Sequence, residues 1–315
     1  MRLAVTGASG FVGGAVCRAA TAAGHEVRAF GRRAHVDPDH VGGAPYTSWD
    51  ITAGPLTDPP PVDAVVHCAG TVTDWGPAAE FAAANVGGTV SVLKSFPAPV
   101  RFVHVSTASV YDPRRPTVAA GEDAVDLARL PRRFDAYGRS KAEAERAVLA
   151  ARADAVILRP HAVYGPGDTT LLPRVLAGVR GGRLMAVGSG RQLVSLTAVG
   201  NLAQACLLAA ATALLGGGSG IYNIADAEPV VLDQALRAVL AARGVDARPL
   251  YLPFGVALAA ALLSETAARV TGRPPRITRY AVRHLAVERT LDISAARAGL
   301  GYDPVPTSFD GAGSW

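Results

Sequence analysis

The sequence predicts an α/β fold, in which a Rossmann-type doubly wound parallel sheet precedes a smaller, mostly helical C-terminal portion. Two observations support this prediction. Short apolar runs with β character alternate with helical segments over the first 168 residues, as they do in parallel βαβ units. Beyond Asp168 this alternation becomes irregular. Open sheets of this class bind ligands at the carboxyl ends of their strands, so the candidate site residues are expected there.

The first element is a strand, a glycine turn and a helix. Residues 2–5 are an apolar run, residues 6–10 interrupt it, and residues 11–23 fit a helix. The glycines allow positive φ and leave no Cβ between the backbone and a ligand. The free N–H groups at the start of the helix favour an anion. The GxxGxxG spacing of Gly7, Gly10 and Gly13, placed between a strand and a helix, therefore predicts a dinucleotide site.

The second strand, residues 26–30, is followed by Gly31, Arg32 and Arg33. An acidic residue at this position binds the ribose hydroxyls of NAD, whereas an arginine accommodates the 2′-phosphate of NADP. A pair of arginines after a strand is often only a solvated turn. At this position it favours NADP(H) over NAD(H), with Arg32 as the phosphate ligand.

Two further strands, residues 46–49 and 62–68, extend the sheet. Asp50 and Ile51 follow the first of them, and Asp50 either accepts a hydrogen bond from an adenine amino group or caps the next segment. Small residues at the end of the strand over 62–68 leave room for a cofactor to pass; they are Cys68, Ala69 and Gly70.

A helix over residues 78–96, which contains Asn85, leads to a strand over 101–106, and Thr107 follows that strand. The polar segment 112–135 has no clear period, and so long a loop indicates a substrate lid or a mobile segment. Residues 137–151 are rich in strong helix formers. The next strand, 155–158, leads to Pro160 and His161, and His161 is interpreted as a structural hydrogen-bonding group near the cofactor.

Tyr137 and Lys141 lie four residues apart, so their side chains project from one face of a helix. A free phenol has a pKa near 10, and a neighbouring ammonium lowers it toward the range that a general acid or base needs. The hydroxyl of Thr107 is suited to bond a substrate carbonyl and to stabilise developing oxyanion charge. Tyr137, Lys141 and Thr107 are therefore the catalytic candidates.

The C-terminal helices are expected at residues 171–179, 202–215, 232–243, 255–270 and 277–283. Residues 1–168 form the expected dinucleotide-binding domain, to which 196–225 return, and residues 169–195 and 226–315 form the substrate-binding portion. The apolar runs 202–215 and 254–263 are too short to span a bilayer. The second run is interpreted as a buried helix or a pocket wall, with contact to a membrane surface as the alternative.

Composition narrows the function classes. The chain has 315 residues, 50% of them hydrophobic and 18% charged, and a net charge of +5, so it is globular and mildly basic. No stripe of Lys and Arg with interleaved aromatics occurs, which argues against nucleic acid. No metal-ligand spacing occurs either. The three cysteines each lie in an apolar run without CxxC spacing, which indicates buried free thiols, as is typical of a cytoplasmic protein. No signal peptide precedes the first strand.

Together these motifs resemble the extended short-chain dehydrogenase/reductase superfamily. The glycine turn, Asp50 with Ile51, Asn85 within NVGGT and the YxxxK pair match its pattern, and Thr107 stands where Ser is usual. The finer resemblance is to the 3β-hydroxysteroid dehydrogenase-like branch, which includes bacterial reductases of 2-alkyl-3-keto acids. Segments 74–77, 159–168 and 194–201 carry it, although Gly200 stands where many relatives have an acidic residue. The resemblance also implies a homodimer.

The expected activity is an NADP(H)-dependent interconversion of a ketone and a secondary alcohol on a largely apolar substrate. The alternatives are a nucleotide-sugar epimerase or dehydratase on the same scaffold and a non-catalytic NADP(H)-binding regulator. Trp75, Tyr111 and Tyr164 are the expected substrate contacts. The expected cofactor contacts are Thr6, Gly7, Ser9, Gly10, Phe11, Val12, Gly13, Arg32, Asp50, Ile51, Cys68, Ala69, Gly70, Asn85, Lys141, Pro160 and His161.

Overall fold

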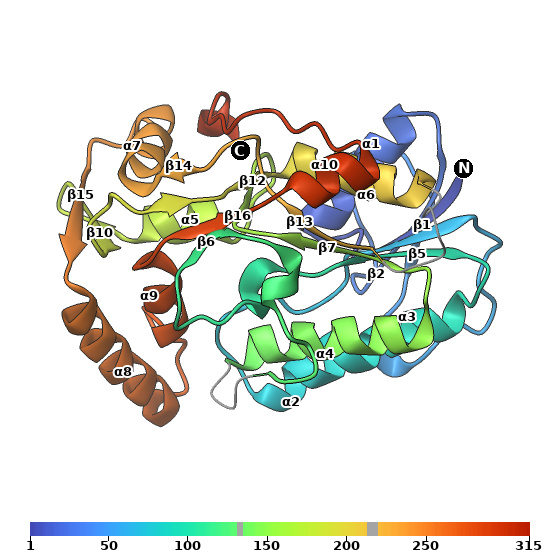
Figure 1. Ribbon diagram of the computed structural model, residues 1–315, viewed down its shortest axis with the longest axis horizontal. Coiled ribbons are helices and arrows are strands. Elements are labelled where there is room, and N and C mark those ends of the chain that lie inside the picture. The colour runs from blue at the N-terminus through green and yellow to red at the C-terminus, as the bar shows by residue number, and fades with distance from the viewer. Residues whose placement is uncertain (131–134, 213–219) are drawn as a thin grey trace.

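The computed structural model describes residues 1–130, 135–212 and 220–315 (Figure 1). Its central element is a parallel sheet with the strand order β13-β7-β5-β4-β1-β2-β3. Chain order reverses between β1 and β4, so the sheet is doubly wound as predicted. The strands are β1 (Arg2–Thr6), β2 (Glu26–Gly31), β3 (Tyr46–Ser48), β4 (Ala64–His67), β5 (Arg101–Val105), β7 (Val156–Pro160) and β13 (Gly220–Ile224).

Helices cover both faces of this sheet (Figure 1). Alternate residues of β1 serve the two faces, because Leu3 and Val5 belong to one buried cluster and Ala4 to another. The first cluster is completed by α1 (Phe11–Ala22), α6 (Val199–Ala211) and α10 (Ser294–Leu300). The second is completed by α3 (Gly88–Ser95) and α4 (Ala136–Ala151).

The C-terminal portion contains helices together with small sheets whose pairing the sequence did not predict. Its helices are α5 (Leu171–Ala177), α7 (Leu232–Ala242), α8 (Phe254–Thr271) and α9 (Arg279–Leu285). One sheet has the order β15-β10-β9 and another β14-β11-β16-β6, and β12 pairs with β8. Their strands are β6 (Thr117–Ala120), β8 (Val163–Tyr164), β9 (Val179–Arg180), β10 (Arg183–Val187), β11 (Leu193–Val194), β12 (Thr197–Ala198), β14 (Val230–Val231), β15 (Arg248–Leu252) and β16 (Arg289–Leu291).

Two segments beyond residue 168 pack with the central sheet. Strand β13 pairs with β7 in parallel, and α6 packs on α1. The segment that contains Ile293, Leu300 and Tyr302 joins the same buried cluster, although the sequence placed it in the substrate-binding portion.

The expected helix over 78–96 is one continuous helical segment with a local change of winding. It consists of α2 (Ala78–Phe81), a π-helical stretch, η3 (Ala82–Gly87), and α3. Part of the expected lid, 112–135, forms β6, and residues 131–134 of it lie outside the described residues. The predicted end of the helix over 202–215 also lies outside the described residues.

Of the two interpretations of the apolar run 254–263, the buried helix is wrong, whereas Phe254 and Leu258 of the run do line a cavity. The run belongs to α8, whose Val256, Leu263 and Val270 are 56%, 72% and 83% exposed. In length and composition alone, α8 is the one helix of the described residues that could cross a membrane.

Candidate functional site

The glycine turn forms a cradle that only glycine fits. Gly7 has φ +72°, and a Cβ there would lie 2.7 Å from the backbone nitrogen of Ala69 at the end of β4. A Cβ on Gly13 would lie 2.3 Å from the carbonyl oxygen of Gly7, so α1 packs directly on the turn. Gly10 is the N-cap of α1, and its N–H donates to the Gly7 carbonyl at 2.9 Å. The described residues therefore fit a phosphate group held against backbone N–H groups.

Ser9, Phe11 and Val12 stand at the start of α1, where the N–H groups of the first turn have no partner within the helix. Thr6, another expected cofactor contact, uses its hydroxyl inside the fold, because Thr6 Oγ1 lies 2.7 Å from Nδ1 of the buried His67. His67 Nε2 lies 2.9 Å from Thr89 Oγ1. Burial lowers the pKa of His67 to about 3, so this histidine is neutral and structural.

Arg32 directly follows β2, and its side chain is exposed. Asp50 accepts hydrogen bonds from Thr52 N–H at 2.9 Å and from the Thr52 hydroxyl at 2.8 Å. The bonds from Thr52 lower the pKa of Asp50 most, and the charge of Arg32 lowers it further. Arg32 and Asp50 therefore lie near each other, beyond the carboxyl ends of the neighbouring strands β2 and β3. Ile51 is buried, and a Cβ on Gly88 would meet its side chain.

Small residues follow β4 as predicted, and Asn85 lies against them. A Cβ on Gly70 would lie 2.7 Å from Asn85 Oδ1. Asn85 Oδ1 accepts from Thr71 N–H at 2.7 Å, and Nδ2 donates to Ser140 Oγ at 2.8 Å. Ser140 in turn donates to the carbonyl oxygen of Tyr137 at 2.8 Å. Asn85 thus connects the loop after β4 to the first turn of α4, which positions Tyr137. Cys68 is a free thiol, and its interaction with the neighbouring Cys206 thiol, together with burial, raises its pKa.

The three catalytic candidates come together. Thr107 is the N-cap of the short helical turn after β5, and its hydroxyl lies close enough to the Tyr137 phenol to lower the pKa of that group. Tyr137 lies in the first turn of α4, whose N-cap Asp135 accepts from Gly138 N–H at 2.7 Å. Lys141 is buried one turn later, and its Nζ donates to the Val105 carbonyl at 2.7 Å.

The pKa of Tyr137 does not follow the sequence expectation. Burial raises it to about 12, and the Thr107 hydroxyl only partly opposes this rise. Lys141 is itself affected by burial, which lowers its pKa to about 8, while Glu145 and then Cys68 raise it. Its ammonium is directed to the Val105 carbonyl. Tyr137 is therefore a protonated phenol at neutral pH, as a proton donor must be.

The sequence did not indicate two further hydroxyls at this site. Tyr280 of α9 packs edge-on against Tyr137, with ring centroids 6.2 Å apart, and its hydroxyl lies 2.6 Å from Ser109 Oγ. Thr107 donates to that same Ser109 oxygen at 3.2 Å. Because Tyr280 lies more than 140 residues further along the chain than Tyr137, no local spacing links the two residues.

Pro160 is buried at the end of β7, and His161 follows it. His161 Nδ1 lies 2.6 Å from the Ser195 carbonyl, which only accepts, so Nδ1 carries the proton. Burial lowers the pKa of His161 to about 4. His161 is therefore a neutral hydrogen-bonding group in this structure.

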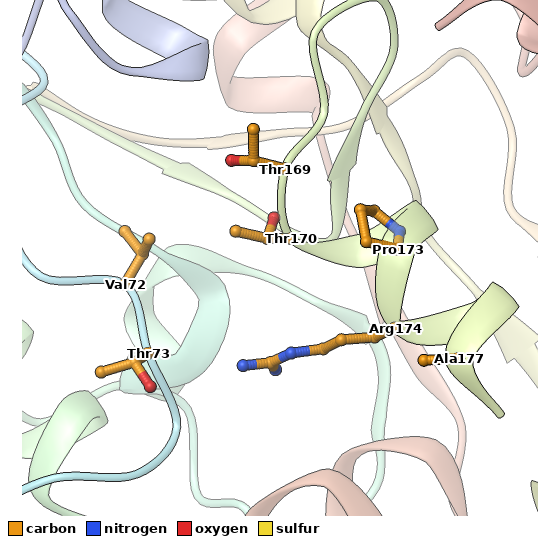
Figure 2. A pocket seen from close by; sticks show the side chains of 7 residues that line it. All are labelled: Val72, Thr73, Thr169, Thr170, Pro173, Arg174 and Ala177. Carbon is orange, nitrogen blue, oxygen red and sulfur yellow. The ribbon is translucent and has the colours of Figure 1, made fainter. Parts of the chain in front are cut away.

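Trp75 lies on the loop after β4, where it contacts the C-terminal portion. The guanidinium carbon of Arg269 in α8 lies 5.5 Å from the centroid of a Trp75 ring. The preceding Asp74 accepts from Arg174 Nη2 and from the Thr278 hydroxyl, both at 2.7 Å. A cavity of about 310 Å³ opens beside this loop (Figure 2). It is lined by Val72, Thr73, Thr169, Thr170, Pro173, Arg174 and Ala177.

Tyr111 and Tyr164 do not fit the substrate role expected of them. Tyr111 is 3% exposed, and its hydroxyl donates to Asn223 Oδ1 at 2.8 Å. Tyr164 is 1% exposed, donates to Asp226 Oδ2 at 2.8 Å and packs against Phe309. Both hydroxyls are used inside the protein, so the structure corrects these two assignments to structural roles. No group of three or more His, Cys, Asp or Glu that could hold a metal occurs in the part of the chain that the structure describes.

Comparison with known proteins gives a consistent result. Residues 3–225 match the model of the NAD dependent epimerase/dehydratase family. A 2-alkyl-3-oxoalkanoate reductase of Stenotrophomonas maltophilia is 34% identical over 96% of this chain and 95% of its own. A ketoreductase of Stigmatella aurantiaca, named for a 4-hydroxy-2-methyl-3-oxo-4-farnesyl-3,4-dihydroquinoline-1-oxide, is 35% identical over 96% of this chain and 92% of its own.

Solved structures agree on the fold. The structure named gox2253 superposes with a TM-score of 0.74 at 26% identity, over 99% of this chain and 96% of its own. A UDP-glucuronic acid 4-epimerase of Bacillus cereus, in complex with UDP-glucuronic acid and NAD, superposes with a TM-score of 0.74 at 21% identity, over 100% of this chain and 97% of its own. With its glycine cradle and its YxxxK helix, the chain belongs to the NAD dependent epimerase/dehydratase family of extended short-chain dehydrogenases/reductases, on the branch of the 3β-hydroxysteroid dehydrogenase-like and 2-alkyl-3-oxoalkanoate reductases.

Proposed function

We propose that this oxidoreductase reduces a ketone on a largely apolar substrate to a secondary alcohol, with NADPH as the reductant. The observation that carries the proposal is the meeting of Thr107 and Tyr137 at the carboxyl end of β5, with Lys141 one turn further along the same helix. The glycine cradle on the same edge of the sheet supports a dinucleotide partner. The exposed Arg32 beyond β2 favours the phosphorylated form of it.

Each of these side chains has a definite task in the proposed reaction. The bound cofactor would supply a hydride to the carbonyl carbon. Tyr137 gives its phenolic proton to the carbonyl oxygen, so the ketone gains one hydride and one proton and becomes the alcohol. The pKa of about 12 keeps Tyr137 protonated until charge develops on the substrate oxygen. Thr107 orients this oxygen by a hydrogen bond.

Lys141 and Asn85 support the proposed roles of Tyr137 and Thr107. The ammonium of Lys141 is close enough to the end of β5 to bond the Val105 carbonyl, and we assign it a second bond to a ribose hydroxyl. Asn85 acts through Ser140 on the Tyr137 backbone and is therefore a positioning residue.

The cavity beside the loop after β4 supports an apolar substrate. Val72, Pro173 and Ala177 contribute apolar surface to it, and two of its threonines precede α5. The relatives named as 2-alkyl-3-oxoalkanoate reductase and as a ketoreductase of a farnesylated quinoline also favour a 3-oxo compound with a hydrocarbon chain. We assign the reaction to a reducing compartment such as the cytoplasm, because all three cysteines are free.

The test is oxidation of NADPH, followed by its fluorescence, with a panel of 2-alkyl-3-oxoalkanoates, 3-ketosteroids and UDP-sugars. We expect turnover with one of the two ketone classes and none with UDP-sugars. Tyr137→Phe should reduce turnover at least about a thousandfold and leave NADPH affinity unchanged. Conversion of a UDP-sugar without net NADPH oxidation would identify an epimerase instead. NADPH binding without any turnover would leave a non-catalytic regulator.

A further inference from the structure

The helix α8 turns its apolar side outward. Val256, Leu263 and Val270 are spaced by seven residues, so they lie along one side of the helix, and all three are more than half exposed. Leu262, 48% exposed, and Phe254, 44% exposed, widen this stripe. The fully buried residues of α8 are three alanines and one glutamate: Ala257, Ala261, Glu265 and Ala268.

The only charge on the buried side is neutralised within the protein. Glu265 is 4% exposed and accepts from the Arg279 backbone N–H at 2.7 Å and from its Nε at 2.8 Å. The helix therefore directs its carboxylate toward α9 and its hydrocarbon side chains toward solvent. This pattern is the reverse of a surface helix that packs its apolar stripe on a core.

Arginines follow the apolar stripe. Residues 253–287 contain five arginines and a single acidic residue, Glu265, and so hold most of the net charge of the chain. Arg273 and Arg276, just beyond the end of α8, are exposed and form no ion pair with any residue that the structure describes. Arg269 is 57% exposed in its side chain.

We propose that the outer face of α8, with Arg273 and Arg276 at its end, binds the surface of an anionic membrane. An uncharged apolar stripe followed by exposed cations matches the boundary between acyl chains and anionic headgroups. The helix lies along that boundary and does not cross it, because its opposite side packs on α9 through Ala257, Ala261 and Val282. Figure 1 shows α8 at the edge of the molecule, away from the central sheet.

The size of the face argues against a second copy of this chain as the occupant. An 18-residue helix is about 27 Å long and about 10 Å wide, so one side of it covers roughly 300 Å². A stable dimer buries roughly 800 Å² on each partner. Membrane binding needs no such area, because each buried apolar side chain and each arginine near the surface adds its own contribution.

The test is flotation with lipid vesicles. The wild-type protein should float with vesicles of equal parts phosphatidylcholine and phosphatidylglycerol, and only weakly with phosphatidylcholine alone. Leu263→Glu with Val270→Glu should reduce flotation at least about tenfold, and Arg273→Glu with Arg276→Glu should make it resemble flotation with neutral vesicles. The control is Val305→Glu, because Val305 is 62% exposed but lies outside α8; it should float as the wild type does.

The NADPH affinity of each variant reports whether it is folded, whatever its catalytic activity. Absence of flotation by the wild type, or full flotation by the Leu263→Glu, Val270→Glu variant, would overturn the proposal. So would a wild-type dimer in gel filtration that this double variant dissociates, because a second copy would then cover the face.

Discussion

At the scale of single residues, Arg32 determines the cofactor prediction. It is exposed at the end of β2, and its charge acts on Asp50. Hydrogen bonds to a charged group contribute about 1.5–3 kcal/mol. Arg32→Ala should therefore weaken NADPH binding by roughly tenfold to a hundredfold and leave NADH binding unchanged, as measured by fluorescence titration. Arg248→Ala, an exposed arginine of β15, is the control, and an unchanged NADPH/NADH ratio in Arg32→Ala would contradict the assignment.

Lys141 makes the proposed reaction sensitive to pH. Burial lowers its pKa to about 8, so the ammonium form is present below this pH and is lost as the pH rises through it. If the ammonium holds a ribose hydroxyl, kcat/KM for NADPH should fall above about pH 8. Lys141→Met should be about a hundredfold slower, with a flat profile in this range. The same fall in Lys141→Met would show that another group titrates.

At the scale of elements, the glycine turn allows a matched comparison of two helical glycines. A Cβ on Gly13 would lie 2.3 Å from the Gly7 carbonyl, whereas a Cβ on Gly200 in α6 meets nothing within 4 Å. Gly13→Ala should lose nucleotide binding and about 1–3 kcal/mol of unfolding free energy, because the turn must shift. Gly200→Ala should gain about 0.5–1 kcal/mol. Thermal unfolding with and without NADPH measures both, and equal effects would contradict the close packing of α1 on the turn.

The elements also show how far sequence reasoning reached. The strand–turn–helix at residues 2–22 and the helix of Tyr137 were predicted from local signals, since glycine spacing and helix formers act within a few residues. The π-helical stretch around Asn85 was not, because no local spacing distinguishes it from the α-helix on either side; its Asn85 is held by bonds with Thr71 and Ser140, which lie outside this helical segment. The exposure of α8 was also missed: an apolar run reads the same whether it faces a core or a surface.

At the scale of the whole molecule, the site depends on contacts between the two parts of the chain. Tyr280 of α9, in the C-terminal portion, packs against Tyr137 of α4, and no pattern within the first 168 residues indicates this contact. Tyr111 and Tyr164 were misassigned for the same reason, because their partners Asn223 and Asp226 lie far along the chain. The motifs thus predicted the glycine turn and the helix of Tyr137, whereas the residues that the C-terminal portion brings to the site had no signal in the sequence.

Substitution of Asp74 tests whether contacts between the two parts of the chain hold Tyr280 at the site. Its carboxylate, 11% exposed, joins the loop after β4 to Arg174 of α5 and to Thr278, the N-cap of α9. Because α9 carries Tyr280, loss of the carboxylate should loosen the substrate side of the site. Asp74→Ala should raise KM for the ketone about tenfold and lower unfolding free energy by about 1–3 kcal/mol.

NADPH affinity should stay unchanged in Asp74→Ala, because the glycine cradle and Arg32 belong to other elements. Asp58→Ala, an exposed carboxylate of the same half of the chain, should leave all three quantities unchanged. A rise in the NADPH Kd as large as the rise in KM would show that Asp74 supports the whole cleft. An unchanged KM would separate the contact at Asp74 from the placement of Tyr280, which would then depend on its own contacts with Ser109 and Tyr137 and on the packing of α9 against α8 and β10.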